Sequence, residues 1–230
     1  CRTAGVILRY DAVTGMKSRV LDGLNQPTGI DVDDNGNIYF TEVPTPGVPG
    51  TMGGTNKVWQ YEPDSQQFTL ISVGEPEPTD VTVTPDGSTV YWTCTSAGVI
   101  VQAMRTGSQP DITTPDVTAI GGTVRFFLDA PGLGGQHYML GNSLGRGPIA
   151  VGMDYLALEQ DFLLATTFAS PNLPFMVGYF GLLDANGMGT AHLVIPPITA
   201  LQGLVFYTAY GVVDMSGVLG LSKTLRSEIE

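Results

Sequence analysis

Two stretches in the first half of the chain repeat each other, and this repeat constrains the fold more than any other feature. Residues 26–42 read QPTGIDVDDNGNIYFTE, and residues 77–94 read EPTDVTVTPDGSTVYWTC. Pro27 aligns with Pro78, which we call the entry prolines, and Gly36 of the first turn aligns with Gly87 of the second. The aromatic residues after the two turns also align when one inserted residue is allowed. Each stretch places alternating apolar residues on both sides of an Asn-Gly or Asp-Gly turn. This pattern predicts two β-hairpins of the same design.

Further strands are expected around the two hairpins. A third strand follows each hairpin, at residues 57–63 and 98–104, and a fourth strand follows in the first repeat, at 67–74. The chain opens with a third and a fourth strand of the same kind, at 5–11 and 16–24. Four antiparallel strands in about 40 to 50 residues is the period of a propeller blade. We therefore expect residues 1–114 to form an incomplete β-propeller of two to three four-stranded blades.

The number of blades is smaller than a closed propeller needs, since closed propellers have at least about four. Three explanations stay open. The chain is the last part of a longer protein, or several copies pool their blades into one ring, or an open stack of blades is capped by another element. The first residue is Cys1 and not methionine, so we expect that a leader or a longer segment has been removed.

The pattern changes in the second half of the chain. A turn-rich stretch at 113–122 (TTPDVTAIGG) ends the repeats, and we place the boundary of a second domain, residues 115–230, there. Seven or eight short apolar strands follow, which predicts a β-sandwich or jelly roll. Residues 155–169 (YLALEQDFLLATTFA) are the best helical candidate, but their aromatic residues and threonines also suit two strands with a bend. We expect the whole chain to be all-β.

Charge and hydropathy exclude two classes of partner. The chain has 22 acidic and 10 basic residues and a net charge of −12, and such a surface repels nucleic acids and anionic membranes. The nearly apolar run at 203–221 (GLVFYTAYGVVDMSGVLGL) approaches the length of a membrane span. It carries Asp214 in its middle, and a charge there is costly in a bilayer. We therefore expect buried strands and no membrane span.

Two family resemblances can be seen in these motifs. The stretches at 5–15 (GVILRYDAVTG), 26–42 and 78–92 resemble NHL-type repeats and their relatives in the gluconolactonase and streptogramin-lyase group, over about residues 5–112. The second half is similar to a β-sandwich module at the C-terminal end of large secreted bacterial proteins, through 182–196 (LLDANGMGTAHLVIP), 201–214 (LQGLVFYTAYGVVD) and 221–229 (LSKTLRSEI). The second resemblance implies export and a surface-associated or appended role.

One stretch has the spacing of a metal site. Residues 31–42 (DVDDNGNIYFTE) match the calcium loop of EF-hands. That loop needs flanking helices, whereas these residues are expected to form a strand, a turn and a strand. We expect a solvated hairpin turn, and calcium bound by Asp33, Asp34 and Asn35 is the alternative. No other cofactor is expected.

No catalytic residue is predicted. The resemblance implies a histidine base for the lyases, but His137 and His192 both lie in the second half. It implies a divalent metal held by acidic and asparagine residues for the lactonases, but Thr28 and Thr79 stand where an asparagine would follow the entry proline. Glu42 alone does not make a site. We expect His192 to lie in a strand, where it packs or faces solvent, and His137 to lie in a loop after the Gly-Gly turn and not to bind a metal.

The sequence therefore favours a non-catalytic, exported structural or adhesive protein, located outside the cell or on its surface, that associates with itself through exposed strand edges. The alternative is the C-terminal part of a secreted lactonase- or lyase-like propeller enzyme whose active residues lie upstream. Cys1 and Cys94 occupy equivalent repeat positions and are expected to be free thiols or bonded to parts not present here. A lipid anchor on Cys1 is a further alternative. The proline-rich insertion at 43–56 either projects towards a neighbour or is a flexible insertion without a role.

Overall fold

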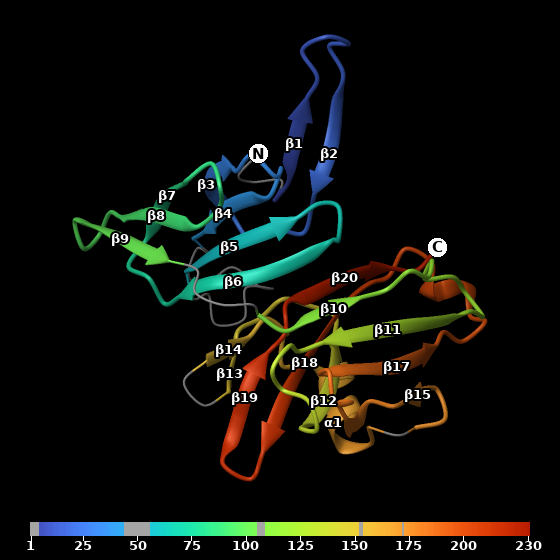
Figure 1. Ribbon diagram of the computed structural model, residues 1–230. Helices are drawn as coiled ribbons and strands as arrows, with labels where there is room; N and C mark the ends of the chain where they lie inside the picture. Colours follow the sequence, from blue (N-terminus) through green and yellow to red (C-terminus); the bar gives the residue numbers. More distant parts are fainter. Residues whose placement is uncertain (1–4, 44–55, 105–108, 152–153, 172) are drawn as a thin grey trace. The chain divides into compact units, whose positions relative to one another are not determined.

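The computed structural model describes residues 5–43, 56–104, 109–151, 154–171 and 173–230. Within these ranges the protein is all-β, as predicted, and consists of several antiparallel sheets, none of them closed. The chain divides into two compact units (Figure 1): Cys1–Asp64 with Thr69–Thr106, and Ser65–Phe68 with Gly107–Glu230. Cys1 and nearly all of the insertion at 43–56 lie outside the described residues.

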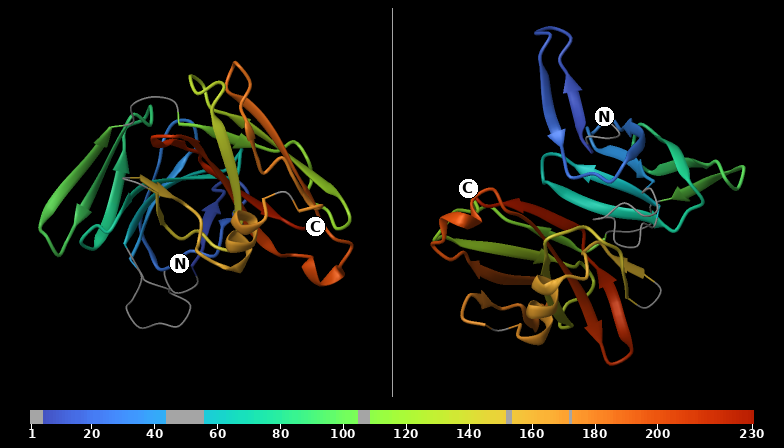
Figure 2. Two further views of the ribbon diagram at one scale, coloured as in Figure 1. Left: turned by 90° about the horizontal axis from the view of Figure 1, so that it is seen from below. Right: turned by 180° about the vertical axis from the view of Figure 1, so that it is seen from behind.

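The first unit contains the strands that the repeat predicts. They are β1 (Ile7–Tyr10), β2 (Lys17–Leu21), β3 (Pro27–Val32), β4 (Ile38–Glu42), β5 (Lys57–Glu62), most of β6 (Gln67–Val73), β7 (Pro78–Val83), β8 (Thr89–Cys94) and β9 (Val99–Met104). We call β1–β2 the amino-terminal hairpin, β3–β6 the first repeat and β7–β9 the second repeat. The amino-terminal hairpin projects from the rest of the unit (Figures 1 and 2). In the described part of the chain, the sheet of the second repeat ends at β9.

The two repeats agree in the details of strand pairing. Ile30 pairs with Phe40 in the first repeat, and Val81 pairs with Trp92 at the equivalent place in the second. In both, the register shifts just after the entry proline. The residues before the prolines, Gln26 and Glu77, have nearly the same positive φ, 52° and 54°. The sequence alignment is therefore also an alignment of backbone conformation.

The two repeats are stacked face to face. Tyr39 and Val58, from one face of the first repeat, are fully buried in a cluster with apolar residues from one face of the second. The second repeat contributes Val81, Val90, Trp92 and Cys94. Residues that pair directly across antiparallel strands share a face of the sheet. By this rule, the face of the first repeat that covers the second also carries Asp31 and Gln60, which both pair with Tyr39.

The second unit contains the remaining elements. They are β10 (Asp111–Thr113), β11 (Thr123–Asp129), β12 (His137–Ser143), β13 (Ile149–Val151), β14 (Asp154–Leu156), α1 (Phe162–Ala169), β15 (Met176–Val177), β16 (Phe180–Leu182), β17 (Met188–Val194), a 3-10 turn (Thr199–Leu201), β18 (Val205–Asp214), β19 (Gly217–Leu221) and β20 (Thr224–Glu228). One sheet has the order β10-β11-β17-β15, and a second has the order β16-β12-β18-β20 with β19 paired to β18. Strands β13 and β14 pair with each other.

Side chains from both larger sheets form one apolar core. In β11 every second residue is buried, namely Val124, Phe126 and Leu128, which is the period-two pattern of a strand with one buried face. Leu140 of β12 and Tyr210 of β18 belong to the same cluster from the other sheet. The core of the second unit thus lies between two sheets.

A short segment from the first half of the sequence completes the second unit. Gln67 and Phe68, the first residues of β6, pair with Leu225 and Thr224 of β20. Phe68 is fully buried, and its ring meets the Tyr207 ring edge to face with 6.0 Å between the centroids. The side chain of Gln67 donates hydrogen bonds to Asp111 and Ile112. The sequence gives no local sign of this pairing.

Each of the two alternatives for residues 155–169, a helix or two strands with a bend, holds in part. Residues 154–156 form β14, but residues 162–169 form helix α1. Asp161 caps this helix, because its Oδ1 accepts the backbone N–H of Leu164 at 2.9 Å. The other oxygen, Oδ2, accepts the backbone N–H of Leu144, outside the helix, at 2.6 Å. A cap of this kind satisfies a free N–H at the first turn, and Leu164 and Thr167 are then buried on one side of the helix.

The apolar run at 203–221 forms β18 and β19, with Tyr210 and Val212 buried in the core. In the described ranges, none of the helices has the length and apolar character that crossing a bilayer requires.

Candidate functional site

The turn at Asp33 is the place where the sequence offers calcium binding as an alternative to a solvated turn. In the structure, both oxygens of the Asp33 carboxylate accept hydrogen bonds. Oδ1 accepts the backbone N–H groups of Asn35 (3.0 Å) and Asn37 (2.9 Å). Oδ2 accepts the Asn37 amide (2.9 Å) and the Tyr39 hydroxyl (3.2 Å). Each oxygen therefore already has two donors, and a cation at Asp33 has to displace some of them. Asp34 and Asn35 are exposed. The solvated turn stays the prediction, and calcium stays its alternative.

Asp31 serves the contact between the two repeats. Its Oδ2 accepts the Thr82 hydroxyl at 2.8 Å and the Val83 backbone N–H at 2.9 Å, while its Oδ1 accepts the N–H of Val32. Partial burial opposes ionisation, but the hydrogen bonds from Val83, Thr82 and Val32 together hold the pKa of Asp31 below its ordinary value. The charged form of Asp31 thus links β3 to the first strand of the next repeat.

Glu42 is buried and acts as a structural acceptor. Its Oε2 accepts the indole N–H of Trp59 at 2.7 Å, and its Oε1 accepts the backbone N–H of Asn25 at 2.7 Å. These bonds fix the end of β4. The threonines after the entry prolines also make equivalent contacts: Thr28 bonds to Thr41 at 2.8 Å, and Thr79 bonds to Thr93 at 3.2 Å.

The two histidines lie on different strands of the second unit. His137 was predicted to lie in a loop, but it begins strand β12 and pairs with Val213 of β18; its ring stacks on Phe180 with 5.4 Å between the ring centroids. His192 in β17 pairs across the sheet with Arg125, whose guanidinium binds Asp116 at 2.8 Å. That hydrogen-bonded ion pair lowers the pKa of Asp116 to about 2. In the part of the chain that the structure describes, no group of three His, Cys, Asp or Glu side chains is placed to hold a metal ion.

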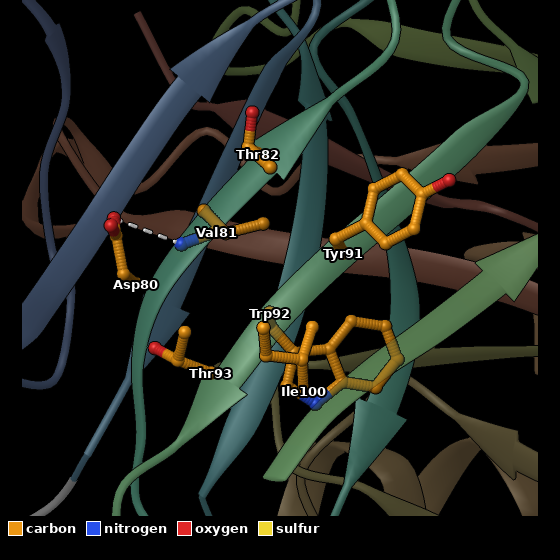
Figure 3. A pocket seen from close by; sticks show the side chains of 7 residues that line it. All are labelled: Asp80, Val81, Thr82, Tyr91, Trp92, Thr93 and Ile100. Carbon is orange, nitrogen blue, oxygen red and sulfur yellow. Dashed lines mark hydrogen bonds between the residues drawn. The ribbon is translucent and has the colours of Figure 1, made fainter.

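The sequence did not predict an open depression of about 260 Å³ on the second repeat. Figure 3 shows that residues from β7, β8 and β9 line it, namely Asp80, Val81, Thr82, Tyr91, Trp92, Thr93 and Ile100. Ile100 and Met104 lie on the same face of β9 as Gln102, and both are exposed. Apolar residues at two of the three positions of one face of an edge strand were the signal that could have pointed to this surface.

Chemically, the depression offers aromatic, apolar and hydroxyl surface with one carboxylate. Asp80 uses an oxygen to accept the N–H of Val81 at 3.0 Å (Figure 3). Val81 and Trp92 belong to the buried cluster on the other side of the sheet. Such a composition suits contact with another protein surface, because aromatic and apolar side chains in a shallow depression provide area for packing.

Comparison with known proteins gives no match: no protein-family model matches the sequence, and no curated protein matches it significantly. The resemblances to NHL-type repeats and to a secreted C-terminal module therefore stay predictions.

Proposed function

We propose that this chain is a non-catalytic, exported structural protein that assembles with itself through the open edges and faces of its sheets. In this proposal, the first unit is an incomplete NHL-like β-propeller and the second is a β-sandwich or jelly roll. The protein acts as a subunit of an assembly outside the cell or on its surface. The enzyme-fragment alternative has no supporting observation in the described residues.

The observation that carries the proposal is the open end of the second repeat. Its sheet ends at β9 within the described chain, and Val99, Ile100 and Met104 of that strand are exposed. An unprotected edge strand with apolar side chains is a template for pairing with another chain. No lysine, arginine or proline lies in β9 to block such pairing.

The amino-terminal hairpin supports the same proposal. A two-stranded hairpin is marginally stable in water unless one face packs on something. Leu8, Tyr10 and Met16 of this hairpin are exposed, and only its base is buried, at Ile7 and Leu21. A partner that covers the hairpin supplies the missing packing.

Two observations support the finer fold assignments. The matched register of the first and second repeats, and their face-to-face stacking, are what consecutive propeller blades require. In the second unit, a core shared by two antiparallel sheets is the arrangement of a β-sandwich.

The test is the mass of the purified chain in solution. Size-exclusion chromatography with light scattering, over a wide range of protein concentration, is expected to show species larger than one chain, and electron microscopy of the same fractions is expected to show regular assemblies. A chain that stays monomeric at every concentration refutes self-assembly. Export is tested separately, by expressing the full gene and measuring how the product divides between cells and medium.

A further inference from the structure

The contact between the two repeats shows how one repeat receives the next. We call the face of the first repeat that carries Tyr39, Val58 and Gln60 its front face, and the opposite face its back face. In the chain, the front face of the first repeat packs on the back face of the second, where Trp92 and Val90 lie. The repeat alignment identifies the same two faces in the second repeat and in the amino-terminal hairpin.

The front face of the second repeat is open. Val58, on the front of the first repeat, is 0% exposed, whereas the equivalent Ile100 is 72% exposed. Val58 pairs with Thr41, and Ile100 pairs with the equivalent Thr93. The two positions therefore have the same place in the sheet and differ only in what covers them. The depression described above lies on this open front face.

The back face of the amino-terminal hairpin is open as well. Its strand β1 is equivalent to β5 of the first repeat. On the back of β5, Trp59 and Tyr61 are 0% and 4% exposed, whereas Leu8 and Tyr10 on the back of β1 are 44% and 61% exposed. The other face of the hairpin, with Arg9 and Ser18, is exposed too. Leu8 and Tyr10 are equivalent to Val101 and Ala103, which pack against the buried cluster of the internal contact. The first unit therefore presents an open front face and, on the hairpin, the third-strand part of a matching back face.

From these observations we infer that, in the self-assembly proposed above on which this inference rests, the front face of the second repeat in one copy binds the back face of the amino-terminal hairpin in a second copy. The two surfaces are different, so the contact is head to tail. Repeated head-to-tail contacts produce a ring if the rotation closes and a filament if it does not.

Two features favour the hairpin over a complete repeat as the occupant. Gly29 lets β7 approach β3 closely, since a Cβ at Gly29 lies 2.6 Å from the Cα of Asp80. The equivalent residue on the front of the second repeat is Asp80 itself, whose side chain prevents another first strand from approaching so closely. The hairpin consists of third and fourth strands alone, and it brings no strand to that place.

Charge is the second feature. In the hairpin, Leu8 pairs with Arg19 and Tyr10 pairs with Lys17, so both cations share the back face with the two apolar residues. The open front face carries the carboxylate of Asp80 and no cation among its described residues. Arg19 already binds Asp22 at 3.2 Å, so Lys17 is the cation of this face that is suited to approach an acidic surface of another copy in a chain of net charge −12.

The experiment uses the full chain with one face blocked at a time. Ile100→Asp blocks the front face, and Tyr10→Asp blocks the back face. Each is expected to raise the concentration needed for assembly by about tenfold or more, as measured by light scattering. Met215→Asp, at a fully exposed turn of the second unit, is the control and is expected to assemble like the unchanged chain. Met104→Asp and Leu8→Asp are the second variants for the two faces.

Mixing the two blocked variants gives the decisive result. The Tyr10→Asp chain keeps a working front face and the Ile100→Asp chain keeps a working back face, so the mixture is expected to form dimers and nothing larger. A mixture that stays monomeric, or blocked variants that assemble as the unchanged chain does, overturns this inference and leaves self-assembly by another surface standing. An unchanged chain that is itself monomeric overturns self-assembly and this inference together.

Discussion

The close approach of β3 and β7 predicts that Gly29→Ala destabilises the first unit. A Cβ at this position lies 2.6 Å from the Cα of Asp80 and 2.8 Å from the backbone nitrogen of Val81, whereas ordinary contacts of a Cβ begin at 3.4 Å. The φ of Gly29 is not in the left-handed region, so an alanine is allowed there and its whole cost is steric. The repeats have to separate by roughly 0.8 Å to admit one methyl group.

The atoms in the way belong to the backbone, so no rotamer change can relieve the contact. Overpacking of this kind costs about 1–3 kcal/mol. Separation of β3 from β7 also lengthens the bonds from Asp31 to Thr82 and Val83, which places the expected loss of stability of the first unit in the upper part of that range, at about 2–3 kcal/mol.

Tryptophan fluorescence measures this loss in the first unit alone, because both tryptophans of the chain, Trp59 and Trp92, are buried there. In urea, the midpoint of the fluorescence transition is expected to fall while its slope is unchanged. Asp80→Ala is the matched control, since it places the same methyl group at the equivalent, exposed position of the second repeat, and it is expected to change the free energy of unfolding by less than about 0.5 kcal/mol. A Gly29→Ala chain as stable as this control refutes the packing described for the two repeats.

Three further results are expected. Tyr39→Phe removes the hydrogen bond to Asp33 and is expected to cost about 0.5–1.5 kcal/mol in the same urea experiment, while Tyr91→Phe, at the equivalent place on the open face, is expected to cost nothing measurable; equal costs contradict the assignment. The pKa of Asp31 is lower in the folded chain than its unfolded value of 3.8, so ionised Asp31 stabilises the fold above that pH, and this stabilisation is lost as the pH falls through the folded pKa. The stability advantage of the unchanged chain over Asp31→Asn is therefore expected to shrink below about pH 4. An advantage independent of pH speaks against the bonds to β7. Burial and the nearby Glu75 carboxylate raise the pKa of the Cys94 thiol, so in a Cys1→Ser chain iodoacetamide is expected to react slowly with the folded protein and rapidly in urea; fast labelling of the folded chain excludes the buried position.

The strands of the first unit could be predicted because their signals are local. Asn35-Gly36 and Asp86-Gly87 specify tight turns, and Gly36 and Gly87 both adopt the positive φ that such turns need. The alternation around each turn then sets which residues share a face. The same signals predicted equivalent registers in the two hairpins, and the structure has them.

Other features depend on contacts that no local pattern specifies. Residues 162–169 suit either a helix or a strand, and the cap that Asp161 provides also depends on its bond to Leu144. The pairing of Phe68 with β20 joins distant parts of the sequence. The open front face was missed for a related reason: Val58 and Ile100 are both apolar and both alternate correctly, and only the neighbouring repeat makes one buried and the other exposed.

The inclusion of Ser65–Phe68 in the second unit affects how this chain acquires its fold during synthesis. The partner of Phe68 is Thr224, so the sheet that contains both cannot close until β20 has left the ribosome. Closing so long a loop is slow compared with forming a local hairpin. We therefore expect nascent chains truncated before β20 to retain the stacked repeats and to leave the ring of Phe68 exposed to solvent. A single cut cannot separate the two units, because the chain passes from one unit to the other three times.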